Sequence, residues 1–144
     1  MRFGTKEWCG AIVEALNRHP DLARALAGLG PDLAVVVERD RGWPRPAAVW
    51  GKHDGARIAS WRMLPDEDDI LELEPAYVVR APYGVWRELL AGADPVKAAM
   101  SGRVRVEGDL EALLRRTGYR YVIDAALAAV ATEFPGDGGP GTEG

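Results

Sequence analysis

The sequence predicts an α+β domain in which a mostly antiparallel sheet is covered on one face by helices. Two helical patterns open the chain, extended segments joined by short turns follow over residues 32–81, and the remainder is helical apart from one alternating strand. Strands and helices that are segregated along the chain in this way indicate an α+β fold. At 144 residues the chain has the length of one domain.

The first two segments are predicted helices. Thr5 can cap a helix whose apolar residues from Trp8 to Leu16 recur at spacings of three and four, so that they form one face. The pair His19-Pro20 ends this helix. A shorter helix follows after Asp21 and stops where glycines and a proline gather, at Gly28, Gly30 and Pro31.

Three strands are predicted next. The β-branched run over residues 33–37 has an apolar period of two, which is typical of a strand. Residues 47–52 and 57–63 are the second and third predicted strands, joined by a tight turn that contains Asp-Gly. The alternation in the third strand is imperfect, so the sequence leaves open which face carries Trp61.

The middle of the chain is predicted to pass from loop to strand to helix. Residues 65–69 form an acidic loop, and residues 70–81 are expected to be extended, with Pro75 interrupting them. Pro82 can then begin a helix that Gly92 ends.

The last part of the domain combines short helices with one strand. Asp94 followed by Pro95 caps and opens a helix. Residues 103–107 alternate between charged side chains and valines, as in a strand with one face toward a core and the other toward water. Two further helices are predicted, over residues 110–114 and 123–131. Residues 1–134 thus form the predicted domain, followed by a Gly-rich acidic tail, 135–144, that is predicted to be disordered.

An ordered set of motifs lies between Ala76 and Leu114. A helix that ends in glycine leads to the Asp94-Pro95 cap and then to the run Gly102-Arg103-Val104-Arg105-Val106-Glu107-Gly108-Asp109. This set resembles that of the sterol carrier protein type-2 family, with arginine where the family has lysine. Each piece alone is common, but the ordered set is specific. The first half of the chain agrees with the family only in the order of its elements.

The resemblance implies a five-stranded sheet, about five helices and an apolar tunnel between them, which in relatives takes up sterols, fatty acids, acyl-CoA or other lipids. It also implies a small stand-alone bacterial member that binds or carries an apolar ligand, without catalysis or a cofactor, and a lid formed by residues 121–134. The predicted lining consists of apolar residues on faces directed toward the core: Trp8, Ile12, Val35, Val37, Trp61, Trp86, Leu89, Leu90, Met100, Val104, Val106, Leu110, Leu113, Ile123, Leu127 and Phe134.

Residues with catalytic chemistry are few and unconnected, so a small hydrolytic enzyme is the weaker alternative. The candidates are two histidines expected in exposed loops and three nucleophiles: His19, His53, Cys9, Ser60 and Ser101. Asp124 would revive this alternative if it lay in a cavity beside a histidine. The acidic residues 66–69 lack the glycine and the terminal glutamate of a calcium loop, so no metal is predicted.

A further alternative is an accessory or protein-interaction domain of a lipid-metabolism system. Trp43, between Gly42 and Pro44 and with Trp50 nearby, could anchor an interface, although loop tryptophans more often fold back onto their own sheet. A monomer or a weak homodimer is expected.

Charge and hydropathy restrict the partners. The net charge is -4, and the lysines and arginines form no continuous basic block, so nucleic acid is an unexpected partner. The chain has no apolar run near the ~20 residues that cross a bilayer and no secretory signal, so a cytoplasmic protein without stable membrane insertion is predicted. Cys9 is expected to be a buried apolar residue in a reducing compartment, because it has no second cysteine to pair with. The final residues lack a Ser-Lys-Leu type peroxisomal signal.

Overall fold

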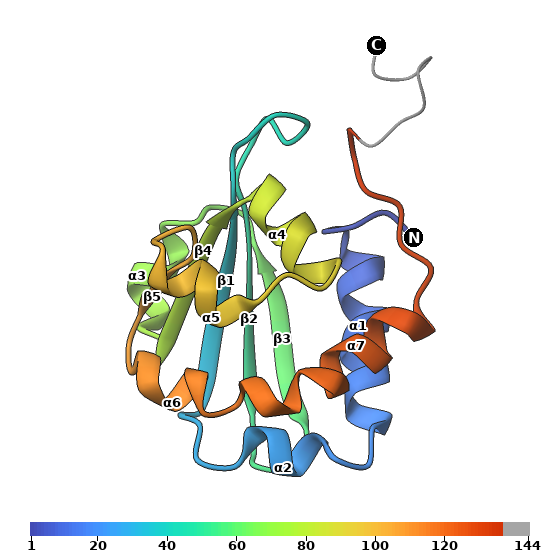
Figure 1. Ribbon diagram of the computed structural model, residues 1–144, viewed down its shortest axis with the longest axis vertical. Helices are drawn as coiled ribbons and strands as arrows, with labels where there is room; N and C mark the ends of the chain where they lie inside the picture. The colour runs from blue at the N-terminus through green and yellow to red at the C-terminus, as the bar shows by residue number, and fades with distance from the viewer. Residues whose placement is uncertain (137–144) are drawn as a thin grey trace.

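A computed structural model describes residues 1–136 and contains a five-stranded sheet in the order β3-β2-β1-β4-β5 (Figure 1). The strands are β1 (Asp32–Glu38), β2 (Ala47–His53), β3 (Ile58–Leu64), β4 (Tyr77–Pro82) and β5 (Arg105–Glu107). Only the central pair, β1 with β4, is parallel, and the other pairings are antiparallel. The predicted α+β class and the mostly antiparallel sheet are therefore confirmed, and the sheet is mixed.

The described residues form seven α-helices and one 3-10 helix, more than the five or so that the resemblance implied, because several helices are short. They are α1 (Lys6–Arg18), α2 (Leu22–Leu26), α3 (Asp69–Leu73), α4 (Tyr83–Leu90), α5 (Pro95–Met100), α6 (Leu110–Leu114), η1 (Thr117–Tyr119) and α7 (Arg120–Ala129).

Three of these helices begin at a side-chain cap that the sequence supplies. The Thr5 hydroxyl accepts a hydrogen bond from the Trp8 backbone N–H, the Asp94 carboxylate caps α5, and the Asp109 carboxylate accepts from the N–H of Ala112. Such caps satisfy backbone donors that the first turn of a helix leaves free. These predicted helix starts are therefore confirmed. Asp21, which could also have capped a helix, precedes α2 but makes no side-chain hydrogen bond to its first turn.

The prediction of an extended segment over residues 70–81 is wrong at its beginning, where α3 forms. The alternating Ile-Leu-Glu-Leu run fits a strand, but one helical turn places Ile70 and Leu73 together against the sheet and leaves Leu71 exposed. Glu74, with φ of 46°, ends the helix in the left-handed region just before Pro75.

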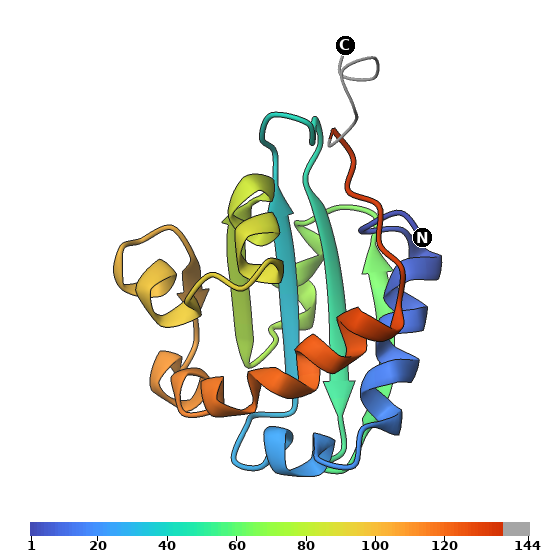
Figure 2. The ribbon, with the colours of Figure 1, turned by 45° about the vertical axis from the view of Figure 1, so that its right-hand side comes forward.

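The two faces of the sheet are covered unequally. Helix α3 packs on the face that carries Ala34, Val36 and Val78, whereas the opposite face supplies Val35 and lies behind α1, α2, α4, α5 and α7 (Figures 1 and 2). In both views α7 crosses in front of the sheet, and it contacts α1, which runs alongside β3. Most of the helical cover thus lies over one face, as predicted, with α3 added on the other.

The pairing of β3 with β2 shows which face of the sheet carries Trp61. Trp61 lies opposite Gly51 of β2 and faces α1, where a methyl group built on Gly10 would stand 3.4 Å from its ring. A glycine at this position of α1 lets the helix approach the indole closely.

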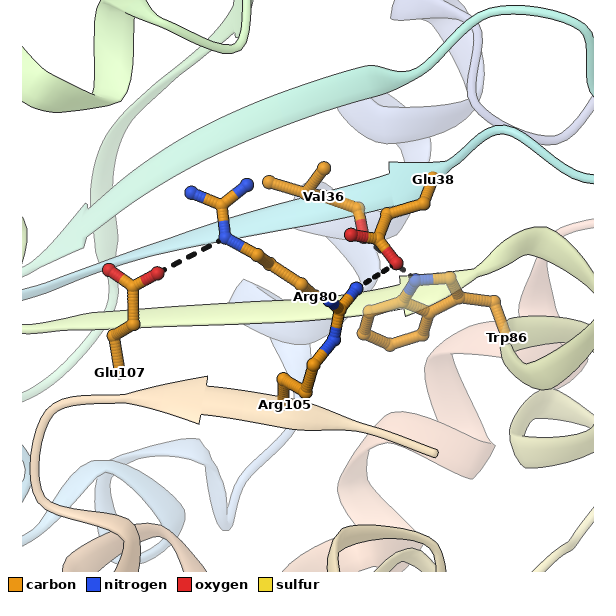
Figure 3. A network of polar contacts seen from close by, with 6 residues as sticks. All are labelled: Val36, Glu38, Arg80, Trp86, Arg105 and Glu107. Carbon is orange, nitrogen blue, oxygen red and sulfur yellow. Dashed lines mark hydrogen bonds and ion pairs between the residues drawn. The ribbon is translucent and has the colours of Figure 1, made fainter. Parts of the chain in front are cut away.

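The face covered by α3 ends in a polar network near the β5 edge (Figure 3). Arg80 Nε lies 3.2 Å from a carboxylate oxygen of Glu107, and Arg105 pairs with Glu38. The charged side chains of β5 thus face solvent on this side, as the alternation predicted. The strand is shorter than the predicted 103–107, and Arg103 instead pairs with Glu88 of α4.

The described end of the chain packs against the rest of the domain. Tyr83 is buried, and its hydroxyl donates a hydrogen bond to the carbonyl of Pro135. The remainder of the predicted tail, residues 137–144, lies outside the described residues, and the domain boundary at residue 134 stays a prediction.

Candidate ligand-binding site

Two apolar cavities lie between the sheet and the helices that cover it. The larger, cavity 1, has a volume of about 290 Å³, is partly open to solvent, and is lined by α1, the segment around Leu29, the first three strands and Tyr77. The smaller, cavity 2, has a volume of about 200 Å³ and is bounded by Phe3, the start of α1, the opposite ends of β1 and β2, and α4. Both exceed the ~150 Å³ of an engineered apolar cavity that binds benzene.

The two cavities adjoin because they have a common wall. Trp8 and Cys9 of α1, together with Val35 of β1 and Val49 of β2, line both of them. The Trp8 indole N–H donates to the Thr132 hydroxyl at 2.9 Å, which ties this wall to the segment after α7. Helix α7 itself lines neither cavity, so the lid function of residues 121–134 stays a prediction.

The polar groups around cavity 1 are largely bonded to the protein itself. The two oxygens of the Asp32 carboxylate accept from the Trp50 indole and from the Ala76 backbone, each at 2.9 Å. The His53 ring contacts the Gly30 carbonyl through Nε2 at 2.7 Å, and its Nδ1 accepts from the Gly55 N–H. What faces the space is therefore hydrocarbon, which suits an apolar ligand.

Cys9 is buried at this common wall, as predicted. Its burial raises the pKa of the thiol to about 11, because the charged thiolate is poorly solvated there. The thiol is therefore protonated near neutral pH and adds a small, nearly apolar surface to both cavities.

Half of the predicted lining residues do surround the cavities. Cavity 1 takes five of them and cavity 2 adds three more: Trp8, Ile12, Val35, Trp61 and Leu113, then Val37, Trp86 and Leu90. Trp86 is fixed at cavity 2 by its indole N–H, which donates to the Val36 carbonyl at 3.0 Å (Figure 3).

The other predicted lining residues lie elsewhere. Leu89, Val104 and Val106 pack in a separate core with Ala81 and Ala98, and Phe134 belongs to an aromatic cluster around Phe3. Leu110 and Leu127 are half-buried but line neither cavity.

Two predicted lining residues face solvent instead of the core. Met100 is 74% exposed and Ile123 is 50% exposed. In α7 the buried stripe is centred on Val122 and Ala126, four residues apart, so that Ile123 is turned away from it. In α5 the inward position belongs to Ala98.

Sequence reasoning missed much of the lining that comes from the first half of the chain. Among the missed residues are Val13, Leu16, Leu26, Leu29, Leu33, Val49, Ile58 and Met63. Their apolar periodicity was visible, and the helical spacing of α1 could have included Val13 and Leu16. The motifs of the family resemblance lie in the second half of the chain, whereas the cavities are lined mainly by α1 and β1–β3.

The residues considered for catalysis do not come together. His19 Nδ1 accepts from the Asp21 N–H, and His53 lies in β2 rather than in an exposed loop. Asp124 is exposed and pairs with Arg120 at 3.5 Å, so it is not the buried carboxylate that would favour an enzyme. Within residues 1–136, no three His, Cys, Asp or Glu side chains are grouped so as to hold a metal ion.

Trp43 folds back onto the domain. Its ring stacks on Tyr83 with centroids 4.9 Å apart and meets Phe3 edge-on. This packing removes the main reason to regard Trp43 as an exposed interface anchor. None of the helices in the described part of the chain is long and apolar enough to span a membrane.

Together, the fold and the cavities define a small α+β domain with two adjoining apolar pockets on one side of its sheet. Residues 61–118 match the model of the SCP-2 sterol transfer family. No curated protein sequence matches the chain.

Solved structures show the same fold. A crystal structure of sterol carrier protein 2 has a TM-score of 0.69 at 22% identity, covering 86% of this chain and 96% of the other. A conserved hypothetical protein from Thermus thermophilus has a TM-score of 0.71 at 21% identity, covering 90% of each chain. The UbiJ-SCP2 ubiquinone synthesis protein has a TM-score of 0.55 at 19% identity, covering 91% of this chain and 99% of the other. The segment matched by the family model contains all of the motifs from Tyr83 to Leu110, on which the resemblance to the SCP-2 family rests.

Proposed function

We propose that this protein binds an apolar, lipid-like ligand in the two adjoining cavities and does not transform it chemically. The observation that carries the proposal is the pair of hydrocarbon-lined spaces that meet at Trp8, Cys9, Val35 and Val49. The match to a sterol transfer family supports the same class of ligand.

The size of the cavities indicates what part of a ligand can enter. Binding sites for small molecules have volumes of about 300–1,000 Å³, so cavity 1 at about 290 Å³ is just below this range. A ligand that also reaches cavity 2 must pass the wall they have in common. We therefore favour a flexible chain, such as a fatty acyl or isoprenoid tail, over a rigid ring system that would have to fit both spaces at once.

Apolar burial alone can support useful affinity. Each methylene that leaves water contributes roughly 0.8 kcal/mol, so a chain of about ten carbons gains about 8 kcal/mol before the cost of association. The pocket contributes little discrimination between neighbouring chain lengths, because one methylene more or fewer changes the free energy only slightly.

The direct test is the content of the protein as purified. Gentle native mass spectrometry and solvent extraction should find a bound lipid, and added fatty acid should displace it with one ligand per chain. A protein that remains empty when offered fatty acids, isoprenoids and sterols would refute the proposal. Bovine serum albumin and lysozyme, taken through the same extraction, provide the binding and non-binding controls.

A further inference from the structure

The loop between β1 and β2, residues 39–46, is basic in a protein that is acidic as a whole. It carries Arg39, Arg41 and Arg45 against one acid, Asp40, whereas the entire chain has a net charge of -4. All three arginines are exposed, and none makes an ion pair with any residue of the described part of the chain. Their charge is therefore free to act on a partner.

The loop is held in a fixed conformation. The backbones of Asp40 and Trp43 exchange two hydrogen bonds of 2.9 Å, which close the turn. The Asp40 carboxylate accepts from the N–H of Arg41 at 2.8 Å and from that of Gly84 at 2.9 Å, so it also ties the loop to α4. These bonds lower the pKa of Asp40 and keep its charge engaged with the backbone. The arginines thus extend from a loop whose base is rigid.

The same loop forms the continuation of the walls of cavity 2. Val37, two residues before the loop, and Ala47, directly after it, both line this cavity, and Trp43 of the loop packs against Phe3 of the opposite wall. The loop projects past the end of the sheet in both ribbon views (Figures 1 and 2). A surface that meets the arginines would therefore lie close to this end of cavity 2.

We propose that the arginines of loop 39–46 dock the protein on the surface of an anionic lipid bilayer, with the end of the sheet beside cavity 2 facing the membrane. Guanidinium groups form strong paired hydrogen bonds with phosphate and carboxylate groups, which such a surface presents in a dense array. The inference rests on the proposed function for its purpose, since docking brings the cavity to the place where an apolar ligand is available. The contact is peripheral and needs no inserted segment.

The number of loop arginines determines how much their removal should weaken binding to an anionic bilayer. Each basic residue near an anionic bilayer strengthens binding by roughly fivefold, so removal of the three arginines should weaken binding by about a hundredfold. The attraction is screened by salt, and about 0.5 M sodium chloride should release the protein.

The test is sedimentation of the full chain with vesicles of phosphatidylcholine that contain roughly one third phosphatidylserine. Wild type should bind these vesicles, and the variant Arg39→Gln/Arg41→Gln/Arg45→Gln should bind about a hundredfold more weakly. The matched control, Arg18→Gln/Arg57→Gln/Arg62→Gln, has the same change in net charge at positions outside the loop and should bind as wild type does. Equal binding by the loop variant, or an equal loss in the control, would overturn the proposal.

Two further measurements separate the bilayer from other causes. Inorganic phosphate, compared with sodium chloride at the same ionic strength, should release no additional protein; selective release would show a site for soluble anions and overturn bilayer docking. The loop variant should take up fatty acid from solution as wild type does, so vesicle binding and ligand uptake can fail separately. Failure of uptake in wild type refutes the proposed function, whereas failure of vesicle binding refutes only the docking.

Discussion

Val35 lies at the wall between the two cavities, so its replacement by phenylalanine tests whether the space there is available to a ligand. Phenylalanine adds about four carbon atoms, which would occupy the room of about four ligand methylenes. At roughly 0.8 kcal/mol for each methylene, the ligand loses about 3 kcal/mol, which corresponds to binding more than a hundredfold weaker.

In the ligand-free protein, Val35→Phe should not have the destabilising effect that a larger side chain has in a fully packed core. A larger side chain in a packed interior costs about 1–3 kcal/mol, whereas a side chain that enters a hollow gains burial. We expect Val35→Phe to leave the free energy of unfolding unchanged or to raise it. The matched control is Val36→Phe, one residue along β1, where the side chain is fully buried beside Ala34, Ala48 and Val78 and lines neither cavity.

The assay combines thermal unfolding with displacement of a fluorescent fatty acid. Val36→Phe should lower the melting temperature by several degrees, at about 3 °C per kcal/mol for a domain of this size. Val35→Phe should keep its melting temperature but lose binding, and Ile123→Phe, at an exposed position, should do neither. The reasoning is refuted if Val35→Phe is as destabilised as Val36→Phe, because the interior would then be solid, or if it binds the fatty acid as tightly as wild type.

Other predictions follow from three single residues, Cys9, Asp40 and Gly108. Burial raises the pKa of the Cys9 thiol from 9.0 to about 11, so alkylation by N-ethylmaleimide near neutral pH should be about a hundredfold slower than in the urea-unfolded chain. Bound fatty acid should slow the alkylation further. If fatty acid does not change the rate, Cys9 does not line the ligand cavity. The same shift means that the folded state holds the thiol proton more tightly than the unfolded state does. The resulting contribution to the free energy of unfolding should be fully present below pH 9.0 and decline between pH 9.0 and about 11. Cys9→Ala should lack this decline in urea titrations at different pH values. Asp40→Asn should lower the free energy of unfolding, measured in urea at neutral pH, by less than about 1 kcal/mol. Because the pKa of Asp40 is lowered in the folded state, the difference between variant and wild type should disappear as the pH falls below 3.8 and through that lowered pKa. A difference that stays constant with pH would argue against the carboxylate contacts. Gly108→Ala should be far more destabilising than Gly102→Ala, since both have positive φ but only the methyl group at Gly108 would approach a backbone oxygen, that of Ala76, to 2.2 Å; similar urea midpoints would show that φ alone sets the cost.

The local structure that the sequence predicted well is the structure that neighbouring residues decide. Thr5 and Asp94 cap their helices through hydrogen bonds to backbone groups two or three residues away, so the caps are readable from the chain. The alternation around Val104 and Val106 likewise predicted which side of β5 meets the core and which meets water. By contrast, Ile70 to Leu73 fits a strand and a helical turn equally well, and contact with Val36 and Val78 from distant strands selected the helix.

The cavity lining shows the same division. Trp8, Val35 and Trp61 were recognised as apolar and inward-facing, but residues such as Leu89 and Val104 have the same character and fill a solid core. Apolar periodicity predicts which side of a helix or strand is buried. It does not predict whether the facing element packs closely enough to leave no cavity between them. That depends on how α1 is spaced from the sheet, where Trp61 meets Gly10.

The α+β class, the helix caps and the resemblance to the SCP-2 family are readable from the chain alone, because they depend on short-range hydrogen bonding, on periodicity and on an ordered set of motifs. The parallel pairing of β1 with β4, the direction of Trp61 toward α1 and the wall at Val35 between two hollow spaces emerge only when the chain has folded. The physical reason is that a hollow is a property of the distance between elements, and that distance is set by side chains far apart in the chain that meet only after folding.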